Sequence, residues 1–419
     1  MHAVGSVAPV APPVPWYRSV TSAQRRALTA ASLGWMLDSM DAMVYSMVLA
    51  YLMKDLTMSK STGGLLASMG QLAGAAGGMV FGVLADRLGR TRALMGSIAI
   101  YSIFTAACGF SQTITQLAVL RVIVGFGLGG EWAAGAALVS ETWPAEHRGK
   151  ALGVMQSFWA IGYALAAAVT AIVFPRWGWR AVFFVGALPA LLVFWIRRSV
   201  EEPAIWRERR HSTGIERPGP RLLFTPPLWR YTIPLVLINS GALFAYWGFN
   251  SWNPAFLSLP PSEGGVGLSA VTMSTFVIVM QGGTFLGYVS YGVISDRIGR
   301  KKTYVAYLLL AAALLPVYGR MRNPVALLAL GPAVGFFGTG LFSGFGAVVA
   351  ELFPTHIRAT ALGFCYNLGR IVSAVAPFTV GSLAEKHGFT VGFVVLSGAF
   401  LFSAIVWVFI PETKGRVLT

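Results

Sequence analysis

Charged residues are scarce in this sequence of 419 residues. Asp, Glu, Lys and Arg together make up 11% of the chain, against roughly 25% in a typical soluble globular domain. Hydrophobic residues make up 55%, and the mean hydropathy is +0.65. Such a composition cannot supply the polar surface that a water-soluble domain or a disordered chain requires, so it excludes both a soluble enzyme and a disordered protein.

Motifs for metal, nucleotide and covalent chemistry are also missing. The 2 cysteines, Cys108 and Cys365, both lie in apolar stretches, and no metal-binding spacing surrounds them, which argues against a disulfide framework or a metal site. The sequence has no lysine-containing glycine-rich loop that could hold a nucleotide phosphate, and no catalytic triad. We therefore expect no cofactor, no metal and no enzymatic activity.

Long apolar runs fill most of the chain. None of them alternates as the strands of a membrane barrel do, and each is long enough to cross a bilayer as a helix, which satisfies its own backbone in lipid. We predict twelve membrane-spanning helices at about 27–52, 61–84, 93–111, 115–138, 150–173, 180–199, 229–257, 270–294, 303–319, 325–348, 358–384 and 389–410.

The distribution of Lys and Arg predicts the orientation. With the N-terminus in the cytoplasm, 23 of the 32 Lys and Arg residues fall on the inner side and 7 on the outer side. Because basic loops stay in the cytoplasm, both termini are expected there, with the protein in the cell inner membrane. The net charge of +16 is then an orientation signal that can also contact anionic lipid, and no nucleic-acid partner is expected.

Two motifs occur twice in the chain. The first reads GVLADRLGRTR from Gly82 and GVISDRIGRKK from Gly292. The second reads ETWPAEHRGKALG from Glu141 and ELFPTHIRATALG from Glu351. Both pairs are 210 residues apart, which indicates two halves of the same hand. Such a repeat predicts a pseudo-symmetric carrier with its substrate site between the halves.

These motifs resemble those of the major facilitator superfamily over residues of about 25–412. The resemblance implies an all-α membrane protein of two six-helix bundles that works by alternating access. The expected organisation is a cytoplasmic tail (1–26), an N-terminal bundle (27–199), a cytoplasmic linker (200–228), a C-terminal bundle (229–410) and a second cytoplasmic tail (411–419). The proline-rich start of the chain lacks the apolar core and cleavage site of a signal peptide, so we interpret it as a loose tail.

Charges in the repeated motifs are candidates for a cytoplasmic gate. A carboxylate in these loops can face a neighbouring helix N-terminus and accept hydrogen bonds from nearby arginines. The alternative is that the loops are basic orientation signals only. The predicted gate residues are Asp86, Arg90, Glu141, Arg148, Asp296, Arg300, Glu351 and Arg358, with Glu141–Arg148 and Glu351–Arg358 expected as salt bridges.

Three acids lie well within predicted spans, where a charge costs about 2.5–3.5 kcal/mol on insertion scales. Asp38 and Asp41 share one face of the first helix, and Glu131 lies on the fourth. The Asp-x-x-Asp pattern and the RVIVGFG run from Arg121 resemble helices of proton-coupled organic-acid symporters. That resemblance implies a proton-sensitive pair of Asp41 with Arg121. A static clasp between helices is the alternative, Glu131 is a rival proton carrier, and Asp38 could relay the proton or contact substrate.

A single arginine, Arg370, lies near the middle of the eleventh predicted helix with no acid near it on that helix. A guanidinium group matches a carboxylate with two parallel hydrogen bonds. We therefore predict that Arg370 binds the carboxylate of the substrate, with Tyr366 and Asn367 one turn earlier as neighbours. Pairing of Arg370 with Asp38 or another acid across the halves is the alternative.

Other polar residues recur at helical spacing and are candidate pocket linings. Hydrogen bonds between helices are the alternative for each face. Trp247 and Trp252 could instead anchor the chain at the outer membrane interface. The faces comprise Asn239, Tyr246 and Asn250 on the seventh helix, Gln281, Thr284 and Tyr288 on the eighth, and Gln156, Trp159 and Tyr163 on the fifth.

Together these features predict a monomeric proton-coupled symporter of a small organic anion in the lipid bilayer. A monocarboxylate such as lactate is favoured, because the polar set is modest for a large sugar acid. The alternatives are a sialate or aromatic-acid proton symporter, to whose branches the motifs are similar, and more distantly a proton-driven sugar carrier, a drug exporter or a sugar sensor.

Overall fold

The computed structural model describes residues 20–202 and 220–414. The predicted tails are therefore only partly described, as is the predicted linker, and the side chains of Asp86 and Arg148 lie outside the described residues. Within the described ranges the chain is helical with short connections and contains no strand. The first helix, α1, begins at Ser22, so it extends into the predicted tail.

The N-terminal half contains α1 to α6 and the C-terminal half contains α8 to α15. In the first half the helices are α1 (Ser22–Asp55), α2 (Lys60–Leu88), α3 (Arg90–Cys108), α4 (Ile114–Thr142), α5 (Ala145–Val185) and α6 (Ala190–Ser199). In the second they are α8 (Trp229–Ser258), α9 (Ala270–Ile298), α10 (Arg300–Arg320), α11 (Pro324–Gly340), α12 (Phe342–Leu352), α13 (Thr355–Ser373), α14 (Ala376–His387) and α15 (Phe389–Val406).

Ten helical segments in the described ranges are long and apolar enough to cross a membrane. One of them, Lys150–Ser199, contains both the fifth and sixth predicted spans. The helix breaks within it at Gly178, where φ is 73°, and this break separates the two spans. The eleventh predicted span is divided between α13 and α14, and neither of them alone is among the ten segments. The architecture is therefore the expected all-α fold with twelve membrane crossings, and the chain is a multi-pass membrane protein.

Polar side chains begin several of these helices. Thr21 and Gln24 form a reciprocal pair of hydrogen bonds at the start of α1, and Ser59, Thr113 and Ser269 each accept a backbone N–H at the starts of α2, α4 and α9. Such caps satisfy backbone donors that have no partner inside the helix. They fix where each helix begins after its connecting loop.

The repeated first motif makes the same sharp turn in both halves. A single glycine separates α2 from α3 and α9 from α10, with φ of 117° at Gly89 and 119° at Gly299. Only glycine adopts such a φ without steric strain. The symmetry that the sequence predicts is thus present in the backbone.

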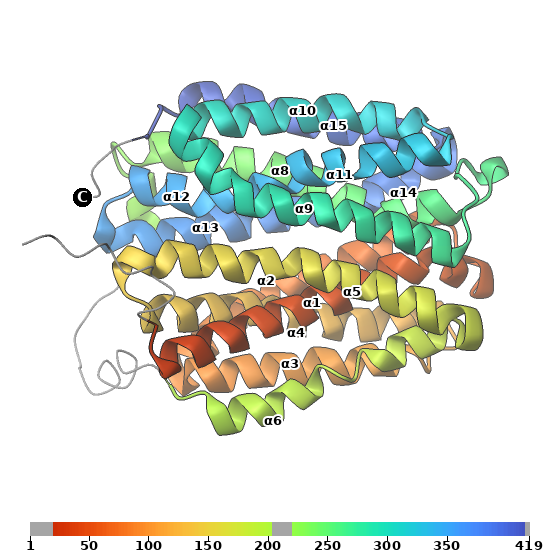
Figure 1. The fold of residues 1–419 in the computed structure, drawn as a ribbon, viewed down its shortest axis with the longest axis horizontal. Coiled ribbons are helices and arrows are strands. Elements are labelled where there is room, and N and C mark those ends of the chain that lie inside the picture. The colour runs from red at the N-terminus through yellow and green to blue at the C-terminus, as the bar shows by residue number, and fades with distance from the viewer. Residues whose placement is uncertain (1–19, 203–219, 415–419) are drawn as a thin grey trace, which may run out of the picture.

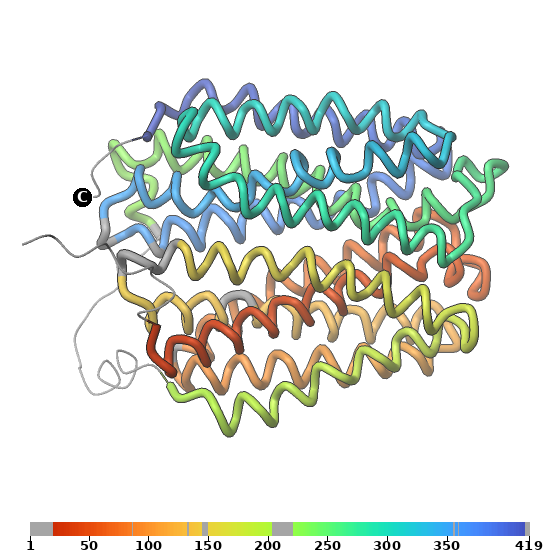
Figure 2. The backbone as a smooth tube through the Cα atoms, viewed as in Figure 1, coloured from red at the N-terminus to blue at the C-terminus, as the bar shows by residue number. Residues whose placement is uncertain are grey.

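The two halves lie side by side with their helices running along the long axis of the molecule (Figures 1 and 2). Between the halves, α5 packs against α9, α2 against α13 and α14, and α1 against α8. Large apolar side chains such as Leu72, Phe194 and Ile405 are exposed on the outside. They form the surface that faces lipid, where only apolar groups are tolerated.

The two ends of the bundle differ. We call the end with Arg90 and Arg300 the basic end, and the end with Ser59 and Glu385 the far end. At the far end the halves are joined: the Lys60 ammonium donates to the Glu263 carbonyl at 2.8 Å, and Ser61 donates its N–H (2.8 Å) and hydroxyl (2.6 Å) to Glu385.

Toward the basic end α2 and α13 separate. Gly78 of α2 still lies near Asn367 of α13, with 3.7 Å between the ideal Cβ position of the glycine and the amide oxygen. One turn further, at Gly82 on α2 and Gly363 on α13, no atom of the described residues lies within 4 Å of that position. Among the described residues, the halves are thus joined at the far end, whereas these two glycines at the basic end have no neighbour across the interface.

Candidate functional site

A polar pocket lies between the two halves, with an empty volume of about 360 Å³. Its charged lining consists of Asp38 from α1, Arg121 from α4 and Arg370 from α13. The remaining lining residues are Ala42, Gly70, Gln71, Gly125, Leu128, Trp159 and Trp247. Both halves contribute, so relative movement of the halves must change the shape of the pocket.

The pocket holds two guanidinium groups and one carboxylate. Asp38 and Arg121 are 3% and 5% exposed, so water screens these charges little. The Arg121 guanidinium stacks over the ring of Tyr45, 4.6 Å from its centroid, and its Nε and Nη1 have no hydrogen-bond partner. A buried site with this excess of positive charge has the electrostatics of an anion site.

Arg370 reaches across the interface between the halves. Its Nη2 lies 2.8 Å from the ideal Cβ position of Gly74 on α2, and its buried Nε has no hydrogen-bond partner. Arg370, which is predicted to bind the carboxylate of the substrate, therefore lines the pocket and has a free N–H donor. No ion pair joins Arg370 to Asp38 in the described part of the chain, although both line the pocket.

Asp41 lies deeper in the N-terminal half than Asp38. It is fully buried, and its Oδ1 lies 3.1 Å from the ideal Cβ position of Gly186. The Thr105 hydroxyl lies close enough to act on it, but neither carboxylate oxygen forms a hydrogen bond of good geometry with a described residue. Arg121 is close enough to act on it electrostatically. No ion pair between Asp41 and Arg121 is formed among the described residues, so this proton-sensitive pair stays a prediction for another state of the molecule.

Glu131 is likewise fully buried on α4, and both of its oxygens lack a hydrogen-bond partner. Oε1 contacts the position where a side chain at Gly34 of α1 would begin. Gly34 is one turn before Asp38, so Glu131 lies on the same side of α1, nearer the basic end. The structure thus places three unpaired acids along one helix interface.

An aromatic wall completes the pocket. The rings of Trp35 and Trp159 are 4.5 Å apart, and Trp159 meets Trp247 edge to face at 6.0 Å. The Trp159 indole N–H donates to the Tyr246 hydroxyl from the other half. The expectation that Trp247 and Trp252 anchor at the membrane interface is wrong: both are buried, and Trp252 donates to the Pro377 carbonyl. Trp159 lines the pocket as the sequence predicts, whereas its contacts with Trp35 and Trp247 were not predicted.

Several predicted pocket residues instead join helices. Asn239 of α8 donates to the carbonyls of Cys365 and Tyr366 on α13, each at 3.3 Å. Tyr163 of α5 donates to the Asn250 carbonyl of α8 at 3.3 Å and so links the halves. For these residues the geometry matches the alternative of hydrogen bonds between helices.

The other predicted lining residues lie near the pocket without lining it. Tyr246 and Asn250 line a second, smaller apolar cavity within the C-terminal half, together with Thr284. Tyr288 on α9 lies beside Gln156 on α5, and Gln281 is buried on α9. Asn367 donates to the Gly363 carbonyl within α13 at 2.9 Å, while Tyr366 is within electrostatic range of Arg370 and Asp38.

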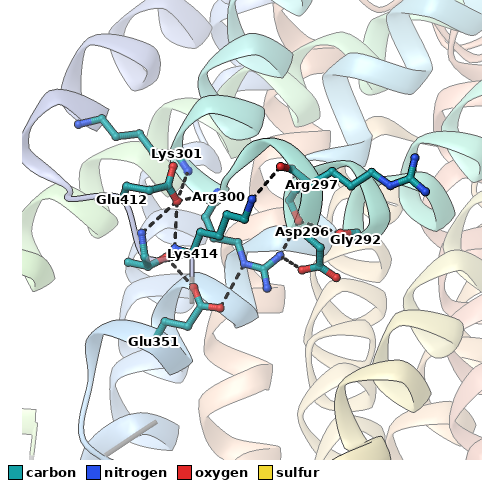
Figure 3. A network of polar contacts seen from close by, with 10 residues as sticks. Gly292, Asp296, Arg297, Arg300, Lys301, Glu351, Glu412 and Lys414 are labelled. Carbon is teal, nitrogen blue, oxygen red and sulfur yellow. Dashed lines mark hydrogen bonds and ion pairs between the residues drawn. The ribbon is translucent and has the colours of Figure 1, made fainter. Parts of the chain in front are cut away.

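The repeated motifs form two matching networks at the basic end. Arg90 binds Glu141 with two hydrogen bonds of 3.0 and 2.7 Å. Its repeat partner Arg300 binds Glu351 at 3.1 Å and also contacts Asp296, as Figure 3 shows. The bonds of Arg90 with Glu141 and of Arg300 with Glu351 and Asp296 each join helices of one half, so they brace the bundle to which they belong. A latch formed by these residues, Arg358 included, stays a prediction.

Two further acids complete the networks and were missed from the sequence. Glu202 accepts the backbone N–H groups of Arg90, Thr91 and Arg92 at the start of α3. Glu412 accepts those of Arg300 and Lys301 at the start of α10 (Figure 3). They too are 210 residues apart, which is the signal that could have identified them. Partial burial raises the pKa of Glu412, but the backbone donors outweigh it and hold that pKa below its usual range.

Two like halves that share one buried polar pocket define a membrane transporter. The family model described as Major Facilitator Superfamily matches residues 31–291 and 258–418. The chain belongs to the major facilitator superfamily. It is a transporter and not an enzyme.

Similar proteins agree with this assignment. The chain is 33% identical over 407 residues to the "Probable 4-methylmuconolactone transporter" of Cupriavidus pinatubonensis, covering 96% of this chain and 93% of the other. It is 32% identical over 384 residues to the "Cis,cis-muconate transport protein" of Acinetobacter baylyi, covering 90% and 91%. The solved structure of a D-xylose-proton symporter shares the fold, with a TM-score of 0.77, 21% identity and coverage of 94% and 99%.

Proposed function

We propose that this protein is a proton-coupled symporter of a small organic anion that works by alternating access. One observation carries the proposal: Arg121 and Arg370 line the same buried pocket between the halves, and Asp38 is the one acid in that lining. Two guanidinium groups facing one carboxylate leave a positive charge that an anionic substrate neutralises. A neutral sugar or a cationic drug would leave it uncompensated.

The aromatic wall favours a planar carboxylic acid. The faces and edges of Trp159 and Trp247 offer contacts to a flat ring or conjugated chain, and such contacts contribute about 0.5–1.5 kcal/mol each beyond area burial. Lactate has no such surface. Among the candidates from the sequence, the aromatic-acid alternative is therefore supported over the small aliphatic monocarboxylate. Two relatives named for muconolactone and muconate transport are consistent with a planar unsaturated acid.

Proton coupling follows from competition within the pocket. An ionised Asp38 attracts the same guanidinium groups that the substrate needs, whereas a protonated Asp38 leaves them to the anion. Binding of a proton and binding of the anion therefore favour one another, and thermodynamic linkage makes this effect reciprocal. Asp41 and Glu131 are the further buried acids through which a proton can enter or leave.

The basic end is proposed to face the cytoplasm, since basic loops remain on that side. The separation of α2 and α13 at Gly82 and Gly363, together with the joined far end, then corresponds to a state open to the cytoplasm. Closing this end and opening the far end would make the pocket accessible from the opposite side of the membrane.

The test is uptake by purified protein in sealed liposomes with an imposed inward proton gradient. Benzoate, cis,cis-muconate, lactate, sialate and xylose are compared. We expect accumulation of benzoate or cis,cis-muconate that disappears when a protonophore removes the gradient. Uptake of xylose alone would refute the anion site, and gradient-independent uptake of an acid would refute proton coupling.

A further inference from the structure

Tyr101 on α3 is a buried polar residue to which the proposed function assigns no role. Its side chain is fully buried, and its hydroxyl group has no hydrogen-bond partner. A buried hydroxyl without a partner costs free energy comparable to that of a lost hydrogen bond, so its presence in the core of the N-terminal half requires a reason.

The three acids that act electrostatically on Tyr101 are Asp41, Asp38 and Glu131. They come from two of the helices that contact α3, since Asp38 and Asp41 lie on α1 and Glu131 on α4. The other contacting helices, α2, α5 and α6, add no charged group to those that act on Tyr101. Each of the three has at least one buried oxygen without a hydrogen-bond partner. The Tyr101 hydroxyl is thus an unpaired donor and acceptor within electrostatic range of three buried carboxyl groups.

The packing of α3 against α4 fixes the position of Tyr101 along the axis of the bundle. The Tyr101 amide nitrogen lies 2.8 Å from the ideal Cβ position of Gly127, which is one turn from Glu131 on α4. On α1, Glu131 contacts the position of Gly34, and Asp41 is seven residues further, or about 10 Å along the axis. Tyr101 therefore lies at a level between Asp41 and Glu131.

The nearby cations act on the acids rather than on Tyr101. Arg370 attracts Asp38, and Arg121 attracts Asp41. Both arginines belong to the central pocket, while Glu131 has no such partner and repels Asp38. A proton released from the pocket acids thus has an unshielded acceptor in Glu131, on the side of the basic end.

We propose that the Tyr101 hydroxyl passes the coupling proton between the pocket acids, Asp38 and Asp41, and Glu131. This inference rests on the proposed proton-coupled transport. In the transfer, a protonated pocket carboxyl gives its proton to the Tyr101 oxygen as Tyr101 gives its own proton to the Glu131 carboxylate. Tyr101 ends neutral, one carboxyl becomes ionised and one becomes protonated, so charge and protons balance.

The experiment compares gradient-driven accumulation of benzoate with benzoate counterflow at equal pH on both sides. Tyr101→Phe removes one oxygen and breaks no hydrogen bond, since the hydroxyl makes none. We expect accumulation to fall about tenfold or more, as for loss of a proton-transfer group, while counterflow stays within about twofold of wild type. A purely structural defect would lower both rates together.

Tyr304→Phe is the matched control. Tyr304 is also fully buried with an unpartnered hydroxyl, but it lies in the C-terminal half against Trp407 and away from the acids. It should leave both rates unchanged. Glu131→Gln, which removes the other end of the transfer, should reproduce the Tyr101→Phe phenotype.

The outcomes separate the relay from the proposed function. If wild type accumulates benzoate without needing the gradient, the proposed function fails and the relay fails with it. If wild type depends on the gradient but Tyr101→Phe or Glu131→Gln accumulates normally, the relay alone is overturned. Equal loss of accumulation and counterflow in folded Tyr101→Phe, with an unchanged melting temperature, also overturns it.

Discussion

At the scale of single residues, the balance of charge in the pocket is set by three side chains. Arg121 and Arg370 provide two positive charges, and Asp38 provides one negative charge. Because all three line a buried pocket that water screens little, a change of one proton or one guanidinium alters the proposed anion site more than it would at a surface. Substitutions that preserve the charge but change the geometry are therefore the most informative.

Arg370→Lys keeps the charge but loses the planar pair of donors. We expect anion affinity to fall about 10- to 100-fold, as for loss of a charge-assisted bond of about 1.5–3 kcal/mol. The measurement is the apparent KM for benzoate uptake. Arg320→Lys changes an exposed arginine and should have no effect. Unchanged affinity in Arg370→Lys would remove this residue from the site.

Gly74→Ala tests the position of the Arg370 guanidinium without changing any charge. A methyl group at Gly74 would lie 2.8 Å from Nη2 of Arg370 and 3.2 Å from the Gly125 carbonyl, so the guanidinium must move. We expect about three- to tenfold weaker benzoate binding, since misplaced groups lose hydrogen-bond geometry. Gly282→Ala, where no atom lies within 4 Å, is the control, and equal affinities in the two variants would contradict the placement.

Asp41→Asn separates coupling from binding. The amide cannot carry the proton, so accumulation driven by the gradient should be lost, while counterflow should remain. Asp55 lies on the same helix in an exposed pair with Arg180, and Asp55→Asn should accumulate benzoate normally. Full accumulation by Asp41→Asn would exclude Asp41 as a coupling residue.

At the scale of elements, the far end depends on a contact between the start of α2 and the end of α14. The hydroxyl and N–H of Ser61 stabilise the ionised form of Glu385 and lower its pKa. A lowered pKa in the joined state means that the contact contributes above the ordinary pKa of a glutamate. The contribution is lost as the pH falls through the lowered value.

Glu385→Ala should therefore open the far end more often at neutral pH, and acid should do the same to the wild-type contact. The measurement is labelling of a cysteine at Ser68, which accepts the N–H of Phe378 across the same interface at 3.1 Å, by a membrane-impermeant maleimide. Labelling should rise severalfold in Glu385→Ala and stay low in the neighbouring Lys386→Ala. Equal labelling in both would show that this contact does not hold the end closed.

The elements themselves were largely predictable from the sequence. Hydrophobic length locates the spans, and the 210-residue repeat predicts the two like halves, which the matching turns at Gly89 and Gly299 confirm. The division of the eleventh span into α13 and α14 was not predicted. Hydrophobic length alone does not show it, although Pro377 in the first turn of α14 is a signal for a helix start there.

The site was predictable in its charges but not in its contacts. An ionisable residue in lipid is conspicuous, so Asp38, Arg121 and Arg370 could be identified from the chain alone. Whether Asn239 faces the pocket or α13 depends on helix rotation, which sequence spacing leaves open. Trp247 and Tyr101 were missed as site residues because a buried aromatic residue resembles ordinary core until its neighbours are known.

At the scale of the whole molecule, the transporter consists of two braced bodies that meet at one end. Each half has its own ion-pair network at the basic end, Arg90 with Glu141 and Arg300 with Glu351. Because these networks lie inside the halves, each bundle can move as a unit without breaking them. In the proposed alternating-access cycle, the movement would take place at the interfaces of α2 with α13 and α14, and of α5 with α9.

The empty space beside Gly82 and Gly363 has a practical consequence. In the proposed cycle this end closes as α2 approaches α13, and two glycines at that level leave room for a close approach of the helix backbones. A rigid compound bound between these helices would hold the transporter in one conformation without competing with the anion for its site. A blocker of this kind would be selected for its thickness, not for its resemblance to the cargo.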